Sequence, residues 1–445
     1  MIKLKHLATL FLVASFCYSC TSGLVISKKE IRTVTQMVED SPVFARQFTG
    51  FVLYDPETKE TLINKNGSNY FTPASNTKIL SCYTALKILG DSLPVLNYLE
   101  KEEAFYFWGT GNPLLLHPDF DGQNEALELL RKAGKPLRLV EQNFRDSRFG
   151  EGWMWDDYPY YFQVEKSALP LYGNAVRFTL NPGAEMPEIY PEYFRDLSKK
   201  VDSAAWFNVT RDETRNHFEY TLPAKGYKTR VFKEVPFLIS GALLRNLLSD
   251  TLGISVLPGT YIPLDSLAGY HTLYVPMPDS LYRRLMQQSD NFIAEQLLLM
   301  CSDKVFGFQN TQQLIEYAKN NVLTEMPDEL LWTDGSGVSR YNMFTPRSLV
   351  TLLDRMRMEF TEKRLFDLFP AGGQSGTIEN WYGANKPYLF AKSGSLRNTY
   401  CLSGYILTDS GRTLIFSFMN NHFKGTSGEI KDEMEKVLKF VKERF

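Results

Sequence analysis

The amino-acid sequence predicts an α+β protein, in which helices flank one antiparallel sheet and a mixed β/α domain is inserted into the chain. Three observations support this fold class. Strand-like segments lie near both ends of the chain, helical patterns stand beside them, and the long middle region alternates short strands with turn residues. With 445 residues, the chain is long enough for two or three domains.

The first 20 residues have the layout of an export signal. Lys3 and Lys5 precede an apolar stretch from Leu7 to Phe16, which is too short to span a bilayer. We therefore expect residues 1–20 to be a leader. They end at Cys20, which with the following Thr-Ser-Gly is similar to the lipid-acceptor site of a bacterial lipoprotein. We expect a lipid on Cys20 to tether the protein in the periplasm; cleavage without lipidation is the alternative.

The sheet begins after the leader. Two strand-like runs, 49–54 and 60–64, flank a turn that contains Pro56 and predict a hairpin. Apolar residues at helical spacing then begin at Ile79 and predict an amphipathic helix. Ser75 and Lys78 lie near the start of this helix, and because they are three residues apart they share one face.

The middle and the end of the chain complete the predicted domains. Residues 92–274 contain Gly/Pro/Asn turns and one clear helical pattern, 239–252, which we interpret as an inserted domain. The surrounding segments, 21–91 and 275–445, would then form one discontinuous domain. Its late elements are strands over 388–392, 400–408 and 412–420, and a closing amphipathic helix over 429–445.

Composition excludes several functional classes. The chain has 49 Lys and Arg against 51 Asp and Glu, for a net charge of −2, so no broad positive field would attract nucleic acid. The five His residues are scattered, and none forms an H-E-x-x-H or a Cys/His zinc motif. We expect neither a metal site nor a nucleic-acid partner. A Ser-His-Asp triad assembled from distant residues stays open, since such triads have no fixed spacing.

Three short motifs occur in order along the chain. They are Ser75-Asn-Thr-Lys78 at a helix start, Ser289-Asp-Asn291 in a turn between two helices, and Lys392-Ser393-Gly394 in a strand. One or two S-x-x-K motifs are expected by chance in a chain of this length. The ordered triple is far more specific.

The first two motifs suit nucleophilic catalysis. A serine hydroxyl is a poor nucleophile without a neighbouring base. Lys78 can serve as that base for Ser75 if burial and another cation, for which Lys392 is the candidate, lower its pKa. Ser289 would pass the proton on towards the leaving amine, and Asn291 would hold the substrate amide and help to fix Lys78.

The third motif suits substrate binding. Lys392 and Ser393 offer a cation and a hydroxyl to a substrate carboxylate. The backbone N–H groups of Ser75 and Ser395 would form the oxyanion hole.

With these motifs the sequence resembles the penicillin-binding DD-peptidases and serine β-lactamases. Ser289 follows Ser75 by 214 residues, which is similar to the class C penicillin-binding proteins, the D-alanyl-D-alanine carboxypeptidase/endopeptidases of the penicillin-binding protein 4 type in peptidase family S13. Other stretches resemble the same group: Gly109-Thr-Gly-Asn-Pro-Leu-Leu115, Asp146-Ser-Arg-Phe149, Gly152-Trp-Met-Trp-Asp-Asp157, Ser167-Ala-Leu169 and Asp334-Gly-Ser-Gly-Val-Ser-Arg340.

The resemblance implies a DD-peptidase/β-lactamase-like fold and a serine enzyme that binds β-lactams, needs no cofactor and cleaves peptidoglycan stem peptides through an acyl-enzyme on Ser75. Both D-Ala–D-Ala carboxypeptidase and DD-endopeptidase activity fit it. Asp157 and Arg340 match positions that contact the diaminopimelate side chain in this group. The alternatives are a serine β-lactamase, disfavoured by the insert and by the lack of a water-activating carboxylate, and a catalytically silent muropeptide-binding lipoprotein, disfavoured by the intact motifs.

Overall fold

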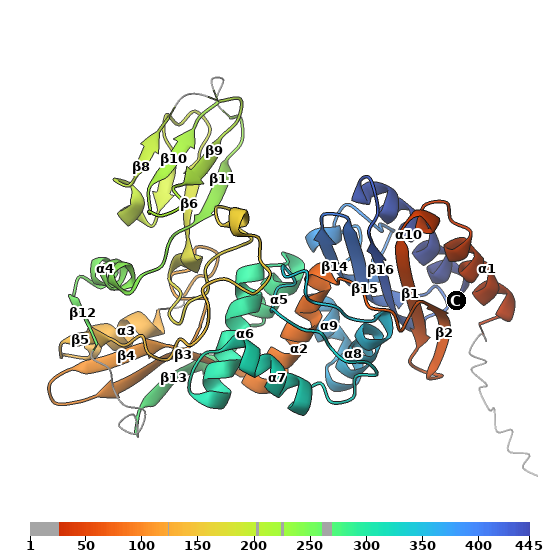
Figure 1. Ribbon diagram of the computed structural model, residues 1–445, viewed down its shortest axis with the longest axis horizontal. Coiled ribbons are helices and arrows are strands. Elements are labelled where there is room, and N and C mark those ends of the chain that lie inside the picture. The colour runs from red at the N-terminus through yellow and green to blue at the C-terminus, as the bar shows by residue number, and fades with distance from the viewer. Residues whose placement is uncertain (1–25, 123, 202–203, 224–226, 260–268) are drawn as a thin grey trace, which may run out of the picture.

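The computed structural model describes residues 26–122, 124–201, 204–223, 227–259 and 269–445 (Figure 1). The leader and the expected lipid-acceptor Cys20 lie outside the described residues. Among the helices of the described ranges, none is long and apolar enough to cross a membrane.

The first and last parts of the chain form one five-stranded sheet, as the sequence predicts, and the strands lie in the order β14-β15-β16-β1-β2. All neighbouring strands in it are antiparallel. β14 lies at the edge, so one side of it is open to other partners. The strands are β1 (Phe48–Asp55), β2 (Glu60–Lys65), β14 (Leu389–Leu396), β15 (Thr399–Leu407) and β16 (Thr413–Asn421).

Helices cover both faces of this sheet, so that the central strands are buried on both sides (Figure 1). On one face, α10 places Ile430, Met434 and Val437 against the sheet at helical spacing. The helices of this face are α1 (Lys28–Glu39) and α10 (Ser427–Arg444). The other layer contains α2 (Thr77–Leu89), α5 (Asp279–Gln287), α6 (Asn291–Phe306), α7 (Thr311–Asn321), α8 (Pro346–Glu359) and α9 (Glu362–Leu368).

The middle of the chain forms a second five-stranded sheet, ordered β12-β5-β4-β3-β13. The sheet begins at Ser92 and ends at Pro276, so its last strand continues past residue 274, where we expected the insert to end. Its elements are β3 (Ser92–Glu100), β4 (Phe105–Gly109), β5 (Leu137–Leu139), β12 (Val256–Pro258) and β13 (His271–Pro276), with α3 (Glu125–Lys132) and α4 (Gly241–Leu252).

Two three-stranded sheets make up the rest of the middle region and, like the second five-stranded sheet, lie across the helical layer from the terminal sheet (Figure 1). Their orders are β11-β6-β7 and β8-β10-β9. They consist of β6 (Ala175–Leu180), β7 (Glu188–Tyr190), β8 (Ser198–Lys200), β9 (Asn208–Arg211), β10 (Phe218–Thr221) and β11 (Val231–Pro236).

The middle region is joined to the helical layer by a continuous apolar core and by one buried carboxylate. Asp303 of α6 accepts hydrogen bonds from Asn97 of β3 at 2.9 Å and from Asn143 at 3.1 Å. Burial raises the pKa of Asp303 to about 6, although both amides stabilise its charge. These contacts fix the insert against α6, the helix that begins with Asn291.

Candidate active site

Ser75 and Lys78 lie side by side where the chain enters α2. Ser75 is in a 3-10 turn, Ala74–Asn76, and Lys78 is the second residue of the helix that follows. The Lys78 Nζ is 3.0 Å from the Ser75 Oγ, within hydrogen-bond reach. The lysine side chain is fully buried. The Ser75 hydroxyl and the Lys78 amine are therefore adjacent, as their spacing at the helix start predicts.

Two further oxygens hold the Lys78 amine. Its Nζ donates to Oδ1 of Asn291 and to the backbone carbonyl of Ser336, both at 2.6 Å. Burial lowers the pKa of Lys78 to about 8, while the charges of Asp334, Glu295 and Asp290 oppose this lowering. Burial alone accounts for the lowered pKa, so the second cation that we invoked from the sequence is not needed to explain it.

Lys392 and Ser289 form a second amine–hydroxyl pair. Lys392 is buried in β14, and its Nζ donates to the Ser289 Oγ at 2.9 Å and to the carbonyl of Ser393 at 2.7 Å. Burial lowers the pKa of Lys392 well below its usual value, and the charge of Lys78 lowers it further. Ser289 has a φ of 58°, a left-handed conformation that costs a non-glycine residue energy and holds its side chain in this turn.

Asn291 is oriented by contacts at both ends of its amide. While Oδ1 accepts from Lys78, Nδ2 donates to the carbonyl of Phe162 at 2.8 Å. The preceding residue, Asp290, caps α6 by accepting from the backbone N–H of Ile293 at 3.0 Å. Asp290 therefore has the capping role that we expected.

The substrate-binding strand lies against the nucleophile because residue 394 has no side chain. A Cβ on Gly394 would lie 2.4 Å from the Pro73 carbonyl oxygen and 2.9 Å from the Ser75 nitrogen. Gly394 thus allows the close approach of the two backbones that the proposed oxyanion hole needs. Beside it, the hydroxyl of Ser393 is 2.6 Å from that of Thr377, and Ser395 is exposed on the open edge of β14.

Several contributors were not predicted. Four groups contact or position the predicted residues although the motifs do not contain them. They are the carbonyls of Ser336 and Phe162, the hydroxyl of Thr377 and the carboxylate of Glu295. Glu295 accepts from the N–H groups of Gly335 and Ser336 at 3.2 and 2.8 Å and so holds this loop. The Ser336 carbonyl itself shares a peptide unit with the Gly337 N–H, which donates to Asp334 at 2.8 Å. The Asp334-Gly-Ser-Gly stretch, which supports the family resemblance, is the sequence signal for this loop, but it does not indicate which carbonyl reaches Lys78.

Among the described residues, the side chains of Asp157 and Arg340 do not form an ion pair with each other. Asp157 is half-buried in the turn Trp155–Asp157, where burial and the neighbouring Asp156 raise its pKa. Arg340 is exposed, and its guanidinium lies 3.4 Å from the backbone oxygen of Arg397. A shared role for these residues in binding stays a prediction.

Other reactive groups lie away from this site. The described residues contain no group of three His, Cys, Asp or Glu that could hold a metal ion. Cys82, Cys301 and Cys401 are buried free thiols, and burial raises the pKa of each. They have the character of apolar core residues.

A comparison with protein families identifies the chain. The model of the D-Ala-D-Ala carboxypeptidase 3 (S13) family matches residues 31–441. The chain belongs to this family. As a family member it is a serine-type D-Ala–D-Ala carboxypeptidase, a hydrolase, which confirms the family and activity that the ordered motifs predict.

Individual relatives match most of the chain. The D-alanyl-D-alanine carboxypeptidase DacB of Haemophilus influenzae is 25% identical over 422 residues, 84% of this chain and 86% of DacB. A D-alanyl-D-alanine carboxypeptidase of Actinomadura sp. strain R39 is 24% identical over 445 residues, 89% of this chain and 82% of that protein. The crystal structure of penicillin binding protein 4 from Haemophilus influenzae has a TM-score of 0.71 at 21% identity and covers 93% of this chain and 99% of its own. This likeness confirms the predicted fold class.

Proposed function

We propose that the enzyme cleaves D-Ala–D-Ala, or the D-Ala to diaminopimelate cross-link, of peptidoglycan stem peptides through an acyl-enzyme on Ser75. The observation that carries this proposal is the buried lysine, with its lowered pKa, 3.0 Å from the Ser75 hydroxyl. Carboxypeptidase and endopeptidase activity use the same acylation and differ only in what leaves.

The first half of the reaction makes the acyl-enzyme. Neutral Lys78 takes the Ser75 proton as Oγ attacks the carbonyl carbon of the penultimate D-Ala. The oxygen of the tetrahedral intermediate takes the negative charge, which the N–H groups of Ser75 and Ser395 stabilise. The C–N bond then breaks, and the leaving amine receives a proton by way of Ser289. Lys392 and Ser393 hold the carboxylate of the leaving D-Ala.

The second half regenerates the enzyme. Water gives a proton to Lys78 and attacks the ester carbonyl, and the ester bond to Ser75 breaks. The product is the peptide ending in D-Ala, and the serine regains its proton. Asn291 keeps the Lys78 amine in place during both halves through the contacts at the two ends of its amide.

The same chemistry supports β-lactam binding, since a β-lactam presents a strained amide and a carboxylate to Ser75 and Lys392. A structure of the Haemophilus influenzae protein is described as complexed with a β-lactam. We further propose that the enzyme acts in the periplasm and that Cys20 carries the lipid that tethers it. Residues 1–20 have basic residues first, then an apolar stretch, then small or polar residues before Cys20, and this export-signal layout supports a location in the periplasm.

Purified, cross-linked muropeptides test the proposal directly. Mass spectrometry after incubation should show loss of the terminal D-Ala, cleavage of the cross-link, or both. The Ser75→Ala protein is the control for contaminating peptidases. Intact muropeptides after incubation with folded wild-type enzyme would contradict the proposed function.

A further inference from the structure

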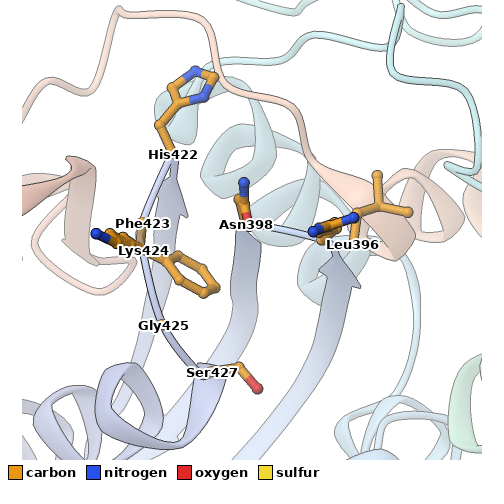
Figure 2. A pocket seen from close by; sticks show the side chains of 8 residues that line it. Leu396, Asn398, His422, Phe423, Lys424, Gly425 and Ser427 are labelled. Atoms are coloured by element: carbon orange, nitrogen blue, oxygen red, sulfur yellow. The ribbon is translucent and has the colours of Figure 1, made fainter.

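A pocket of about 570 Å³ opens where the substrate-binding strand ends. One wall is the turn 396–398 that follows β14. The other is the segment from His422, just after β16, to Ser427, the first residue of α10. Figure 2 shows these segments facing each other across the pocket, with Phe423 between them. The size suits a small ligand group.

The pocket is basic. Arg397, His422 and Lys424 contribute side chains to its lining, and no lining residue is acidic. Within the described part of the chain, neither Arg397 nor Lys424 has an ion-pair partner. The first acidic residue of α10, Glu429, is exposed and does not line the pocket. Cations gathered without counter-charges raise the local concentration of anions.

The position of the pocket relative to the catalytic groups suggests which anion it receives. Lys392 and Ser393, which would hold the leaving-group carboxylate, come first along β14, and Gly394 lies beside Ser75. A peptide that extends from the carboxylate past the nucleophile therefore continues towards Leu396. Because an extended chain advances about 3.3 Å per residue, acyl-side residues one or two places before the penultimate D-Ala reach the turn 396–398.

The open edge of β14 supports this path. Residues 370–372 form backbone hydrogen bonds with Ala391 and Leu389 and so cover the start of the strand. Backbone groups alternate along a strand, so Ser395 faces the same edge as Leu389 and Ala391, and its N–H and C=O can pair with an extended peptide, whereas Leu396 is paired with Thr399 of β15. A peptide paired there would reach the turn 396–398, which is one wall of the pocket.

We infer that this pocket binds a carboxylate carried by the acyl side of the peptide substrate, through Arg397, Lys424 and His422. The inference rests on the proposed function and adds a specificity site to it. It differs from the contact expected of Asp157 and Arg340, because a zwitterionic side chain needs an anion and a cation, whereas this pocket offers only positive charge.

Matched peptides test the inference. Each ends in D-Ala–D-Ala and carries either glutamate or glutamine one or two residues before the penultimate D-Ala. For at least one position, wild-type kcat/KM should be about tenfold higher for the carboxylate than for the carboxamide. The R397A/K424A double variant should lose this preference, as should wild type in high salt.

Two controls separate the pocket from other effects. Lys439→Ala removes an exposed charge from α10 outside the pocket and should leave the preference unchanged. Acylation by benzylpenicillin, which lacks the acyl-side carboxylate, should be the same in the double variant and the wild type.

The remaining outcomes overturn the inference. One is a wild type with equal kcat/KM for the glutamate and glutamine peptides. The other is an R397A/K424A variant that still prefers the glutamate peptide. A double variant that keeps the preference but loses binding to polyphosphate would assign the pocket to a separate anionic polymer. If the wild type forms no adduct with benzylpenicillin, the proposed function fails and the inference falls with it.

Discussion

The indole Nε1 of Trp153 donates a hydrogen bond to Oδ2 of Asp334 at 2.7 Å, which joins the inserted region to the loop that holds Lys78. The same buried carboxylate accepts from the backbone N–H groups of Gly337 and Ser339 at 2.8 and 2.7 Å. A carboxylate is suited to this position because every neighbour that it contacts there is a donor.

Replacing Asp334 with Asn should therefore destabilise the protein. The amide would turn an NH₂ group towards buried N–H donors, and each unsatisfied polar group costs about 1–3 kcal/mol. Because the unfolding entropy of a chain this long is large, we expect a fall in Tm of roughly 1–3 °C. Trp153→Phe, which removes one donor and leaves the carboxylate, should lower Tm less. Thermal unfolding of both variants checks this, and equal stability of D334N and wild type would refute it.

Lys78 should give acylation a distinct pH dependence. Its neutral form is the base, and its pKa is lowered to about 8. The rate of benzylpenicillin acylation should rise with pH, through a midpoint near that value, and level off above it. Lys78→Ala should lose at least about 10²-fold in rate, and Lys78→Arg, which stays charged, should be as slow. A flat profile between pH 6 and 9 would assign the base elsewhere.

Ser75 should carry the covalent adduct with penicillin. Intact-mass measurement of the wild type should show one added penicillin, and peptide mapping should place it on Ser75. The Ser75→Ala protein should show no adduct although it folds normally, because Oγ is the only atom removed. Labelling that persists in this variant would exclude Ser75 as the nucleophile.

Arg340 should affect peptides that contain diaminopimelate more than simple ones. Truncating one charge of a binding contact in a partly dry cleft typically costs about 2–5 kcal/mol. We expect Arg340→Ala to lower kcat/KM on diaminopimelate-containing peptides by roughly 30-fold or more. Cleavage of a simple acyl-D-Ala–D-Ala should change little. Equal losses on both substrates would show that Arg340 supports the catalytic centre instead.

Cys20 should be labelled by a fatty-acid analogue in growing cells. The wild type should then remain with membranes after a salt wash, since acyl chains bind through apolar burial that salt does not weaken. The Cys20→Ala protein should be unlabelled and be released. A variant that still partitions with membranes would contradict a lipid anchor at this residue.

The terminal sheet could be predicted because its strands are apolar and rich in β-branched and aromatic residues. The prediction placed the late edge strand at 388–392, whereas β14 runs to Leu396. The missing residues are Ser393-Gly394-Ser395, whose weak strand propensity hides a strand that pairing with β15 enforces. In the insert, α3 was missed because it has only eight residues, too few for a clear helical period.

The catalytic side chains could be predicted because their order and spacing are distinctive. The carbonyls of Ser336 and Phe162 could not, since every residue has a carbonyl and only the folded chain decides which one reaches the site. The roles of Glu295 and Thr377 were hidden for a related reason. Each acts through a neighbour distant in sequence, and neither belongs to a periodic pattern.

The lowered pKa of Lys392 couples substrate capture to proton uptake. A carboxylate placed beside its Nζ would raise that pKa, so the complex binds more protons than the free enzyme at any pH between the two values. The carboxylate offsets the positive charge that it induces on Lys392, so an anionic ligand and a proton enter the site together as a neutral pair. Capture of the carboxylate is therefore favoured at a pH where the amine in the complex stays protonated.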